Sequence, residues 1–241
     1  MKNTQVAVYL ALAFFFYAGA HATTVTLTNK CQDTVWPATL ANAGSPQLST
    51  TGFELASQAS KTIDFPAAWA GRFWARTQCS GGPGSFRCVT GNCGSGDVEC
   101  KGLSGSTPAT LMEVHVQNNG EPDFYDVSNV DGFNVPMSIT PQGGTGDCQT
   151  SSCAKNINDV CLEDLKFVSD GKVVGCKSAC EVYGGVQYCC KSDDTPQTCP
   201  PTKYSQFFEE QCPQAYSYAK DDVNSTFTCK SVANYVITFC P

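Results

Sequence analysis

Apolar and polar residues alternate along many short stretches of this 241-residue chain, which is the pattern of half-buried β-strands. In the run 71–77, Arg72, Trp74 and Arg76 fall on one face, and in the run 109–116 Glu113 falls opposite the apolar positions. Further strand-like runs lie at 25–27, 35–36, 62–65, 124–127, 135–139, 225–229 and 234–240. Because the apolar side of these strands needs a second sheet to cover it, the pattern predicts a mainly β protein with a sandwich architecture.

Apolar periodicity falls and cysteine density rises between 148 and 212, which predicts a second region dominated by loops. Helices are expected at 160–167, with Asn158 as the cap, and at 177–183. A third is expected at 205–212, where aromatic residues recur at helical spacing before Pro213 ends the run.

The first 22 residues have the charge, apolar run and small-residue exit of a secretory signal peptide. A membrane anchor is the alternative, but about 18 apolar residues are needed to span a bilayer, and Tyr17, Gly19 and His21 interrupt the run. Residues 1–22 are therefore interpreted as a signal peptide, and no stable membrane insertion is expected. The protein is expected to be secreted to the extracellular space or the vacuole.

All 16 cysteines follow residue 22, so an oxidising compartment favours eight disulfides. Zinc binding is the alternative, because the spacings of Cys88 with Cys93 and of Cys176 with Cys180 are close to zinc spacings. Zinc requires reduced thiolates and often histidine, whereas His115 is the single histidine after residue 22. No metal and no cofactor are expected.

The net charge of −7 disfavours nucleic acids and anionic membranes as partners, since both attract clustered Lys and Arg. A neutral partner such as a polysaccharide is not disfavoured, and a monomer is expected. The triplet Asn224-Ser225-Thr226 is an acceptor motif for N-glycosylation at Asn224.

The segment 84–100 contains three cysteines and four glycines, too little apolar material for a core of its own. It resembles the signature of the thaumatin-like family, the plant pathogenesis-related proteins of the thaumatin and osmotin type, except that Asn92 stands where the family usually has Asp. Other similar stretches are 29–36, 71–77, 123–137, 187–190, 199–205, 215–218 and 238–241, so the resemblance covers nearly all of the chain after residue 22.

The resemblance implies that residues 23–241 form one thaumatin-like unit, a flattened antiparallel β-sandwich of about eleven strands. The core sandwich would comprise about 23–76, 113–154 and 213–241, the signature loops about 77–112, and a disulfide-rich helical region about 155–212. It also implies the pairs Cys31–Cys240, Cys79–Cys88, Cys93–Cys100, Cys148–Cys229, Cys153–Cys212, Cys161–Cys176, Cys180–Cys189 and Cys190–Cys199.

Antifungal members of the family carry an acidic cleft, and matching their motifs assigns its residues here. The acids fall on Glu113, Asp126, Asp131 and Asp221, while the arginine is Arg72 or, as the alternate, Arg76. Paired carboxylates hydrolyse glycosidic bonds when one stays protonated and another ionised, which gives Glu113 as acid and Asp126 or Asp131 as base. Aromatic residues at 124–125, Tyr125 among them, and at 216–218 are candidates for stacking on sugar rings.

Three functions follow from these residues. The first is an antifungal defence protein that binds β-1,3-glucan or another cell-wall polysaccharide in the acidic cleft, where carboxylates accept hydrogen bonds from hydroxyls. The second is a weak endo-β-1,3-glucanase that uses the same carboxylates. The third is a non-enzymatic protein that permeabilises membranes or inhibits enzymes, although the negative charge weakens binding to anionic membranes.

Overall fold

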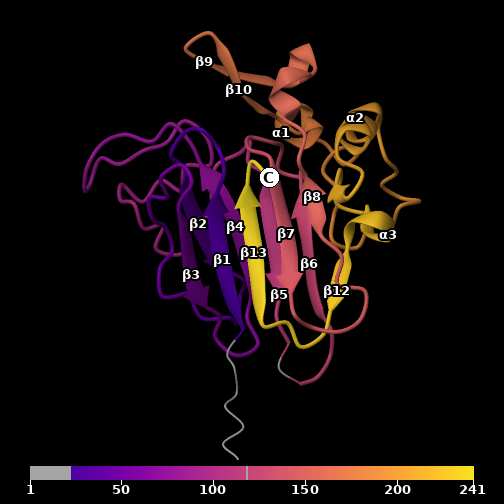
Figure 1. Ribbon diagram of the computed structural model, residues 1–241. Coiled ribbons are helices and arrows are strands. Elements are labelled where there is room, and N and C mark those ends of the chain that lie inside the picture. Colours follow the sequence, from indigo (N-terminus) through magenta and orange to yellow (C-terminus); the bar gives the residue numbers. More distant parts are fainter. Residues whose placement is uncertain (1–22, 118) are drawn as a thin grey trace, which may run out of the picture.

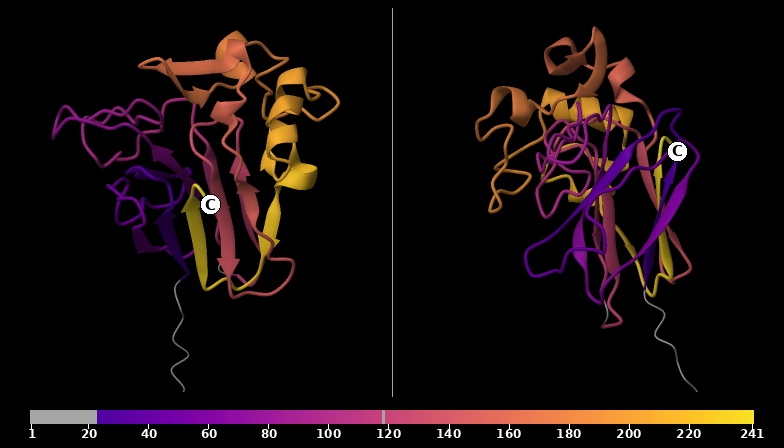
Figure 2. Two further views of the ribbon diagram at one scale, coloured as in Figure 1. Left: turned by 45° about the horizontal axis from the view of Figure 1, so that its top comes forward. Right: turned by 90° about the vertical axis from the view of Figure 1, so that its left-hand side faces the viewer.

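The computed structural model describes residues 23–117 and 119–241, and the expected signal peptide at 1–22 lies outside these residues. Two β-sheets pack face to face, and the view along their edges in Figure 2 separates the layers. One sheet has the order β3 (Ser60–Asp64), β1 (Thr24–Asn29), β13 (Asn234–Phe239), β7 (Met137–Gln142) and β8 (Ser151–Cys153). The other has the order β11 (Ala215–Tyr216), β6 (Asp123–Ser128), β5 (Leu111–His115), β4 (Ala70–Arg76) and β2 (Trp36–Ala41), with β12 (Phe227–Cys229) also paired to β6.

Most neighbouring strands are antiparallel, so the predicted mainly β sandwich is confirmed, and its sheets hold five and six strands. Two pairs are parallel: β1 with β13, and β11 with β6. In the first of these, the N-terminal and C-terminal strands of the described chain lie side by side in the middle of a sheet (Figure 1).

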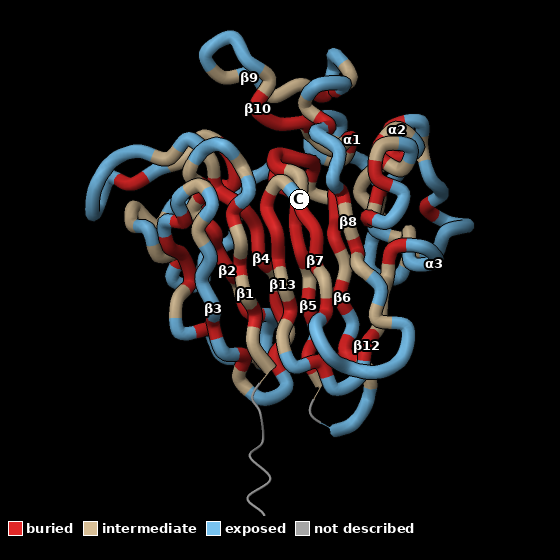
Figure 3. The backbone as a smooth tube through the Cα atoms, in the orientation of Figure 1, coloured by how far each residue is buried: buried red, intermediate tan, exposed pale blue. Residues whose placement is uncertain are grey.

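Alternating apolar positions from both sheets fill the space between the layers. Buried residues, drawn in red in Figure 3, recur along the central strands of the sandwich. On β5, Met112 and Val114 point into this core, as the alternation predicted. Tyr235 on β13 is also fully buried, and its hydroxyl donates to Asp123 of the other sheet at 2.8 Å. At about 25 cal/mol per Å² of apolar surface removed from water, this shared core is the main source of stability of the sandwich.

The signature loops cover the opposite face of the six-stranded sheet at one end and form a second, smaller core there. Trp74 is fully buried in it, and its indole N–H donates to the carbonyl of Gly91 at 2.7 Å. Asn92 accepts a hydrogen bond from the backbone N–H of Cys88 at 3.3 Å, so the amide serves inside the loop where the family usually has a carboxylate.

The disulfide-rich region lies beside the sandwich and contains short elements. These are the 3₁₀ turns η1 (Ile157–Asp159) and η2 (Glu163–Leu165), the hairpin β9 (Lys166–Ser169) and β10 (Lys172–Cys176), and the helices α1 (Ala179–Tyr183) and α2 (Lys203–Gln211). A further short helix, α3 (Asp222–Ser225), follows β11. The helices expected at 177–183 and 205–212 are confirmed as α1 and α2 with shifted ends, and α2 begins with a capping box at Thr202 and Ser205.

The prediction of a helix at 160–167 is wrong. Residues 163–165 form one 3₁₀ turn, and Lys166–Ser169 then pairs with β10 around the turn at Asp170 and Gly171. Asn158 does not cap a helix, because its side-chain amide donates to the backbone carbonyl of Asn134 at 3.0 Å. Strand pairing and tertiary bonding therefore override the local helical pattern.

All eight predicted disulfide pairs are confirmed, and none of the cysteines in 23–117 and 119–241 is free. Cys31–Cys240 joins segments 209 residues apart, and Cys148–Cys229 joins segments 81 residues apart. The bonds Cys180–Cys189 and Cys190–Cys199 each span nine residues in the disulfide-rich region. The long bonds thus fix the ends of the sandwich, and the short bonds close loops.

Candidate functional site: an acidic cleft

Strand register places an arginine and two acids in one row on the outer face of the six-stranded sheet. Arg72 on β4 lies directly opposite Glu113 on β5, and Glu113 lies directly opposite Asp126 on β6. Directly opposed side chains on one face have Cβ atoms about 4.5–5.5 Å apart. Arg72 Nε lies 3.8 Å from Glu113 Oε1, so these three residues form one charged row across three neighbouring strands.

A tight turn after β6 brings a third acid to this row. Asp131 precedes Gly132, whose φ of +83° is in the left-handed region that favours glycine. A Cβ at Gly132 would lie 2.7 Å from the carbonyl oxygen of Cys176 and 2.9 Å from Cβ of Pro108, so a side chain does not fit there. The Asp131-Gly132 pair therefore fixes both the turn and the position of the Asp131 carboxylate.

The opposite wall comes from β11 and α3. The Tyr216 hydroxyl donates to Asp222 at 2.8 Å and also contacts the hydroxyl of Thr226. Because β11 pairs with β6, this wall stands next to the Asp126 strand.

Together these elements form an open cleft with a volume of about 390 Å³. Its lining combines one cation, four acids, hydroxyl groups and small apolar side chains. The lining residues are Arg72, Leu111, Glu113, Asp126, Ser128, Val130, Asp131, Tyr216, Ala219 and Asp222.

Burial and mutual repulsion raise the pKa values of three acids in this cleft. Burial raises the pKa of Asp126 well above its usual value, and the charges of Glu113 and Asp222 add to the rise. Burial also raises the pKa of Glu113, an effect that Arg72 opposes and Asp131 strengthens. Burial raises the pKa of Asp131, again opposed by Arg72. Of these three acids, Asp126 is the one whose rise in pKa Arg72 does not oppose, and it lies farthest from the arginine in the row.

Two polar atoms in the cleft are buried without a hydrogen-bond partner among the described residues, Arg72 Nε and Asp126 Oδ2. Buried polar atoms are nearly always hydrogen-bonded in folded proteins. Both atoms are closed to solvent, so a ligand in the cleft meets the other nitrogen and oxygen atoms of these side chains. A sugar hydroxyl both donates and accepts, so it suits both kinds of group. In the part of the chain that the structure describes, no group of His, Cys, Asp or Glu side chains is arranged to hold a metal ion.

Several residues expected in the cleft lie elsewhere. Arg76 is fully buried beneath the signature loops, and its guanidinium donates to the carbonyl oxygens of Trp36 at 3.0 Å and Val98 at 2.7 Å. Arg72 is therefore the arginine of the cleft. Tyr125 is 1% exposed and points into the sandwich core, where its hydroxyl donates to the Gln149 carbonyl.

Asp221 does not line the cleft, because its carboxylate accepts hydrogen bonds from the backbone N–H and the hydroxyl of Ser217, at 3.0 and 2.7 Å. Its neighbour Asp222 faces the cleft instead. The sequence placed an acid at this point of the chain, but two consecutive aspartates give no sign of which one turns inward. Asn224 is exposed on α3, and its glycosylation stays a prediction.

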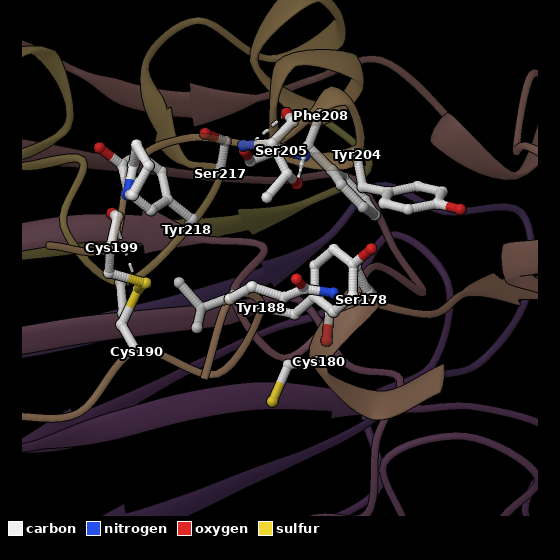
Figure 4. Close-up of a pocket in the computed structure, with 16 residues that line it drawn as sticks. Ser178, Cys180, Tyr188, Cys190, Cys199, Tyr204, Ser205, Phe208, Ser217 and Tyr218 are labelled. Carbon is white, nitrogen blue, oxygen red and sulfur yellow. Dashed lines mark hydrogen bonds between the residues drawn. A yellow bond between two sulfur atoms is a disulfide. The ribbon is translucent and has the colours of Figure 1, made fainter. Parts of the chain in front are cut away.

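A narrow crevice opens beyond the cleft, with Val130 and Ala219 lining both. Figure 4 shows it between Tyr218 and the Cys190–Cys199 disulfide on one side and Tyr204 on the other. Its volume is about 30 Å³, which is enough for about two water molecules and too small for a sugar ring. The acidic cleft itself is therefore the surface available to a ligand here.

Comparisons with known proteins agree with this architecture. The model of the Thaumatin family matches residues 29–241. The chain is 56% identical over 246 residues to "Thaumatin-like protein 1a" of Malus domestica, with all of both chains covered. It is also 56% identical over 244 residues to a Prunus avium protein named "Glucan endo-1,3-beta-glucosidase", again with both chains covered completely.

Among solved structures, the fold is similar to that of a laminaripentaose-producing beta-1,3-glucanase in complex with laminaritetraose, with a TM-score of 0.58. The match covers 92% of this chain and 99% of the glucanase, at 11% identity, and shows a shared fold alone. The family model, the two full-length relatives and the eight disulfides establish that this chain belongs to the thaumatin family.

Proposed function

We propose that this chain is a secreted plant defence protein that binds β-1,3-glucan of fungal cell walls in the acidic cleft. The observation that supports this most is the row of Arg72, Glu113 and Asp126, which places donors and acceptors side by side in an open cleft. A neutral, hydroxyl-rich chain can donate to the acids and accept from the arginine, whereas an anionic ligand would meet four acids against one arginine.

Secretion is supported by the disulfides. Eight disulfides form and persist in an oxidising compartment, which favours the extracellular space or the vacuole over the cytosol. Within 23–117 and 119–241, no helix is both long and apolar enough to cross a membrane.

Weak endo-β-1,3-glucanase activity is the second candidate, and two observations favour it. One full-length relative at 56% identity is named as such an enzyme. In the cleft, the raised pKa of Asp126 suits a proton donor, and an acid beside Arg72 is better placed to stay ionised. This assigns Asp126 as the acid and Glu113 or Asp131 as the base, whereas motif matching alone favoured Glu113 as the acid.

Binding and turnover are separated by two assays on the same variants. The wild type, Glu113→Gln and Asp126→Asn are tested for retention on insoluble β-1,3-glucan and for reducing-sugar release from laminarin. We expect both variants to lose about tenfold or more in glucan binding, about 1.4 kcal/mol. The matched control is Glu54→Gln, an exposed acid outside the cleft, which should bind like the wild type.

The outcomes are distinct. Binding that persists in the double variant Glu113→Gln, Asp126→Asn contradicts the proposed site. Sugar release by the wild type that disappears in Asp126→Asn supports the glucanase, while retention on glucan without any release leaves a binding protein.

A further inference from the structure

A second and larger groove lies at the end of the sandwich beneath the β9–β10 hairpin. Its volume is about 890 Å³, more than twice that of the acidic cleft, and it shares no lining residue with that cleft. We call it the Trp36 groove and define it by Trp36, Thr77, Asn156, Asn158, Lys172 and Val173. In Figure 1 the hairpin stands above the C-terminal end of the chain, and Cys240 lines the groove.

The segments that form the groove are fixed in place. Cys31–Cys240 lines one side, and Cys161–Cys176 anchors β10 on the other. The backbone of Phe133 also exchanges two hydrogen bonds with Cys176, at 2.7 and 2.8 Å. The groove is therefore formed before a ligand arrives, and its volume is in the range of small-molecule sites.

The lining is nearly neutral and mixed in character. Amide and hydroxyl side chains alternate with valines, a proline and Trp36, and the charged residues in the lining are Asp33 and Lys172, which cancel. Asn158 is held in place: its Nδ2 donates to the Asn134 carbonyl, and its Oδ1 is closed to solvent. The exposed amides of the lining are those of Gln78 and Asn156. An aromatic residue with flanking amides suits the apolar faces and hydroxyl edges of sugar rings.

We infer that the Trp36 groove binds a neutral, hydroxyl-rich oligosaccharide independently of the acidic cleft. Sugar hydroxyls bond the exposed amides of Gln78 and Asn156, and Trp36 provides aromatic surface. Charged oligosaccharides are disfavoured, because the near-zero net charge of the lining offers them no attraction to offset their desolvation.

A second sugar site would change how the protein holds an insoluble polysaccharide. Two sites on one rigid body convert the second binding event into an intramolecular one, which raises the overall affinity without new contacts. The inference does not rest on the proposed function, because either site binds without the other.

Tryptophan fluorescence gives a direct test, since Trp69 and Trp74 are fully buried and Trp36 is the partly exposed tryptophan of the described chain. Quenching by acrylamide is measured during titration with laminarihexaose, xylohexaose and an oligogalacturonate. We expect at least one neutral hexasaccharide to protect Trp36 from quenching and the oligogalacturonate to give no protection. The two neutral probes distinguish a β-1,3-glucan from a xylan as the source of the sugar.

Variants assign the signal to the groove. Val173→Arg narrows the groove, and Asn156→Leu removes an exposed amide of its lining; each should weaken protection about tenfold or more. The matched control is Val168→Arg, on the neighbouring strand of the same hairpin, 53% exposed and absent from the lining. Thermal unfolding of each variant verifies folding, and Trp36→Phe should abolish the response.

The inference is overturned if no neutral oligosaccharide protects Trp36, or if protection survives in Val173→Arg and Asn156→Leu. It is also overturned if protection disappears in the cleft variant Asp126→Asn while both groove variants keep it. Retention on glucan without protection of Trp36 would leave the proposed function intact and remove the second site.

Discussion

The sandwich and the disulfide-rich region are stabilised in different ways. The sandwich buries a continuous apolar core between its sheets, and Cys148–Cys229 and Cys31–Cys240 join its distant segments. The disulfide-rich region adds buried residues such as Leu165 and Phe208 to the same core. Its elements are nevertheless short, its disulfide loops are short, and Val186 and Tyr183 are 66% and 44% exposed. Apolar burial therefore dominates in the sandwich, while covalent closure supplements it in the disulfide-rich region.

Removing a disulfide should have the largest effect on stability. A disulfide stabilises the fold by restricting the unfolded chain, and the stabilisation grows with the length of the loop that it closes. Replacing Cys148 and Cys229 with serine removes an 81-residue crosslink and should cost about 4–5 kcal/mol, against about 3 kcal/mol for Cys190 and Cys199 with nine residues. Urea unfolding measures both free energies. Equal losses in the two variants would contradict the dependence on loop length.

Shortening a side chain in the apolar core should have the next largest effect on stability. Leu27→Ala in β1 removes a fully buried side chain and should lower the free energy of unfolding by about 2–5 kcal/mol. Val186→Ala, at a 66% exposed residue of the disulfide-rich region, should change it by less than about 0.5 kcal/mol. Thermal unfolding of both variants at one pH measures the contrast, and a similar loss at both sites would contradict the link between apolar burial and stability.

A smaller effect, of opposite sign, is expected at the cleft. The raised pKa of Asp126 means that its contribution to stability is fully present below the unfolded-state pKa of about 3.9 and is lost as pH rises through the folded-state value. Asn cannot ionise, so Asp126→Asn should stabilise the protein at pH 7, by about 1.4 kcal/mol for each unit by which folding raises the pKa of Asp126. Urea unfolding at pH 7 and pH 3 measures the gain, which should vanish at the lower pH; Glu54→Gln is the control.

The smallest effect should come from Asp164 in the disulfide-rich region, with the reverse pH dependence. Hydrogen bonds from Tyr183 and Tyr204 hold the pKa of Asp164 below its usual value. Its contribution is present above the unfolded-state pKa and is lost as pH falls through the folded-state value. Asp164→Asn should lower Tm by no more than about 2 °C at pH 7 and less at pH 3. A larger loss at pH 3 than at pH 7 would contradict this assignment.

Much of the fold could be predicted from the sequence, because strand alternation, family motifs and cysteine order are local or inherited signals. Glu113 and Asp126 were assigned by motif, and the structure places them opposite each other on neighbouring strands. The β9–β10 hairpin was missed, although Asp170-Gly171 between two apolar runs is a turn signal for it. The helical spacing of 160–167 competed with that signal, and pairing with β10 decided the outcome.

The orientation of single side chains could not be predicted. Arg72 and Arg76 lie on the same face of β4, but the signature loops cover one and leave the other in the cleft, which depends on contacts between distant segments. Tyr125 alternates with its neighbours, so the placement of Asp126 in the cleft requires Tyr125 to face the core. This consequence of strand geometry was available before the structure was known.

The parallel pairing of β1 with β13 has a consequence for biosynthesis. In the five-stranded sheet, β13 joins β1 and β3 on one side to β7 and β8 on the other. Because β13 follows all the other strands of that layer in the sequence, the two halves cannot join on a nascent chain until β13 has been synthesised. Loss of residues 230–241, by a premature stop codon or by proteolysis, would separate β1 and β3 from β7 and β8 and deprive Cys31 of its partner.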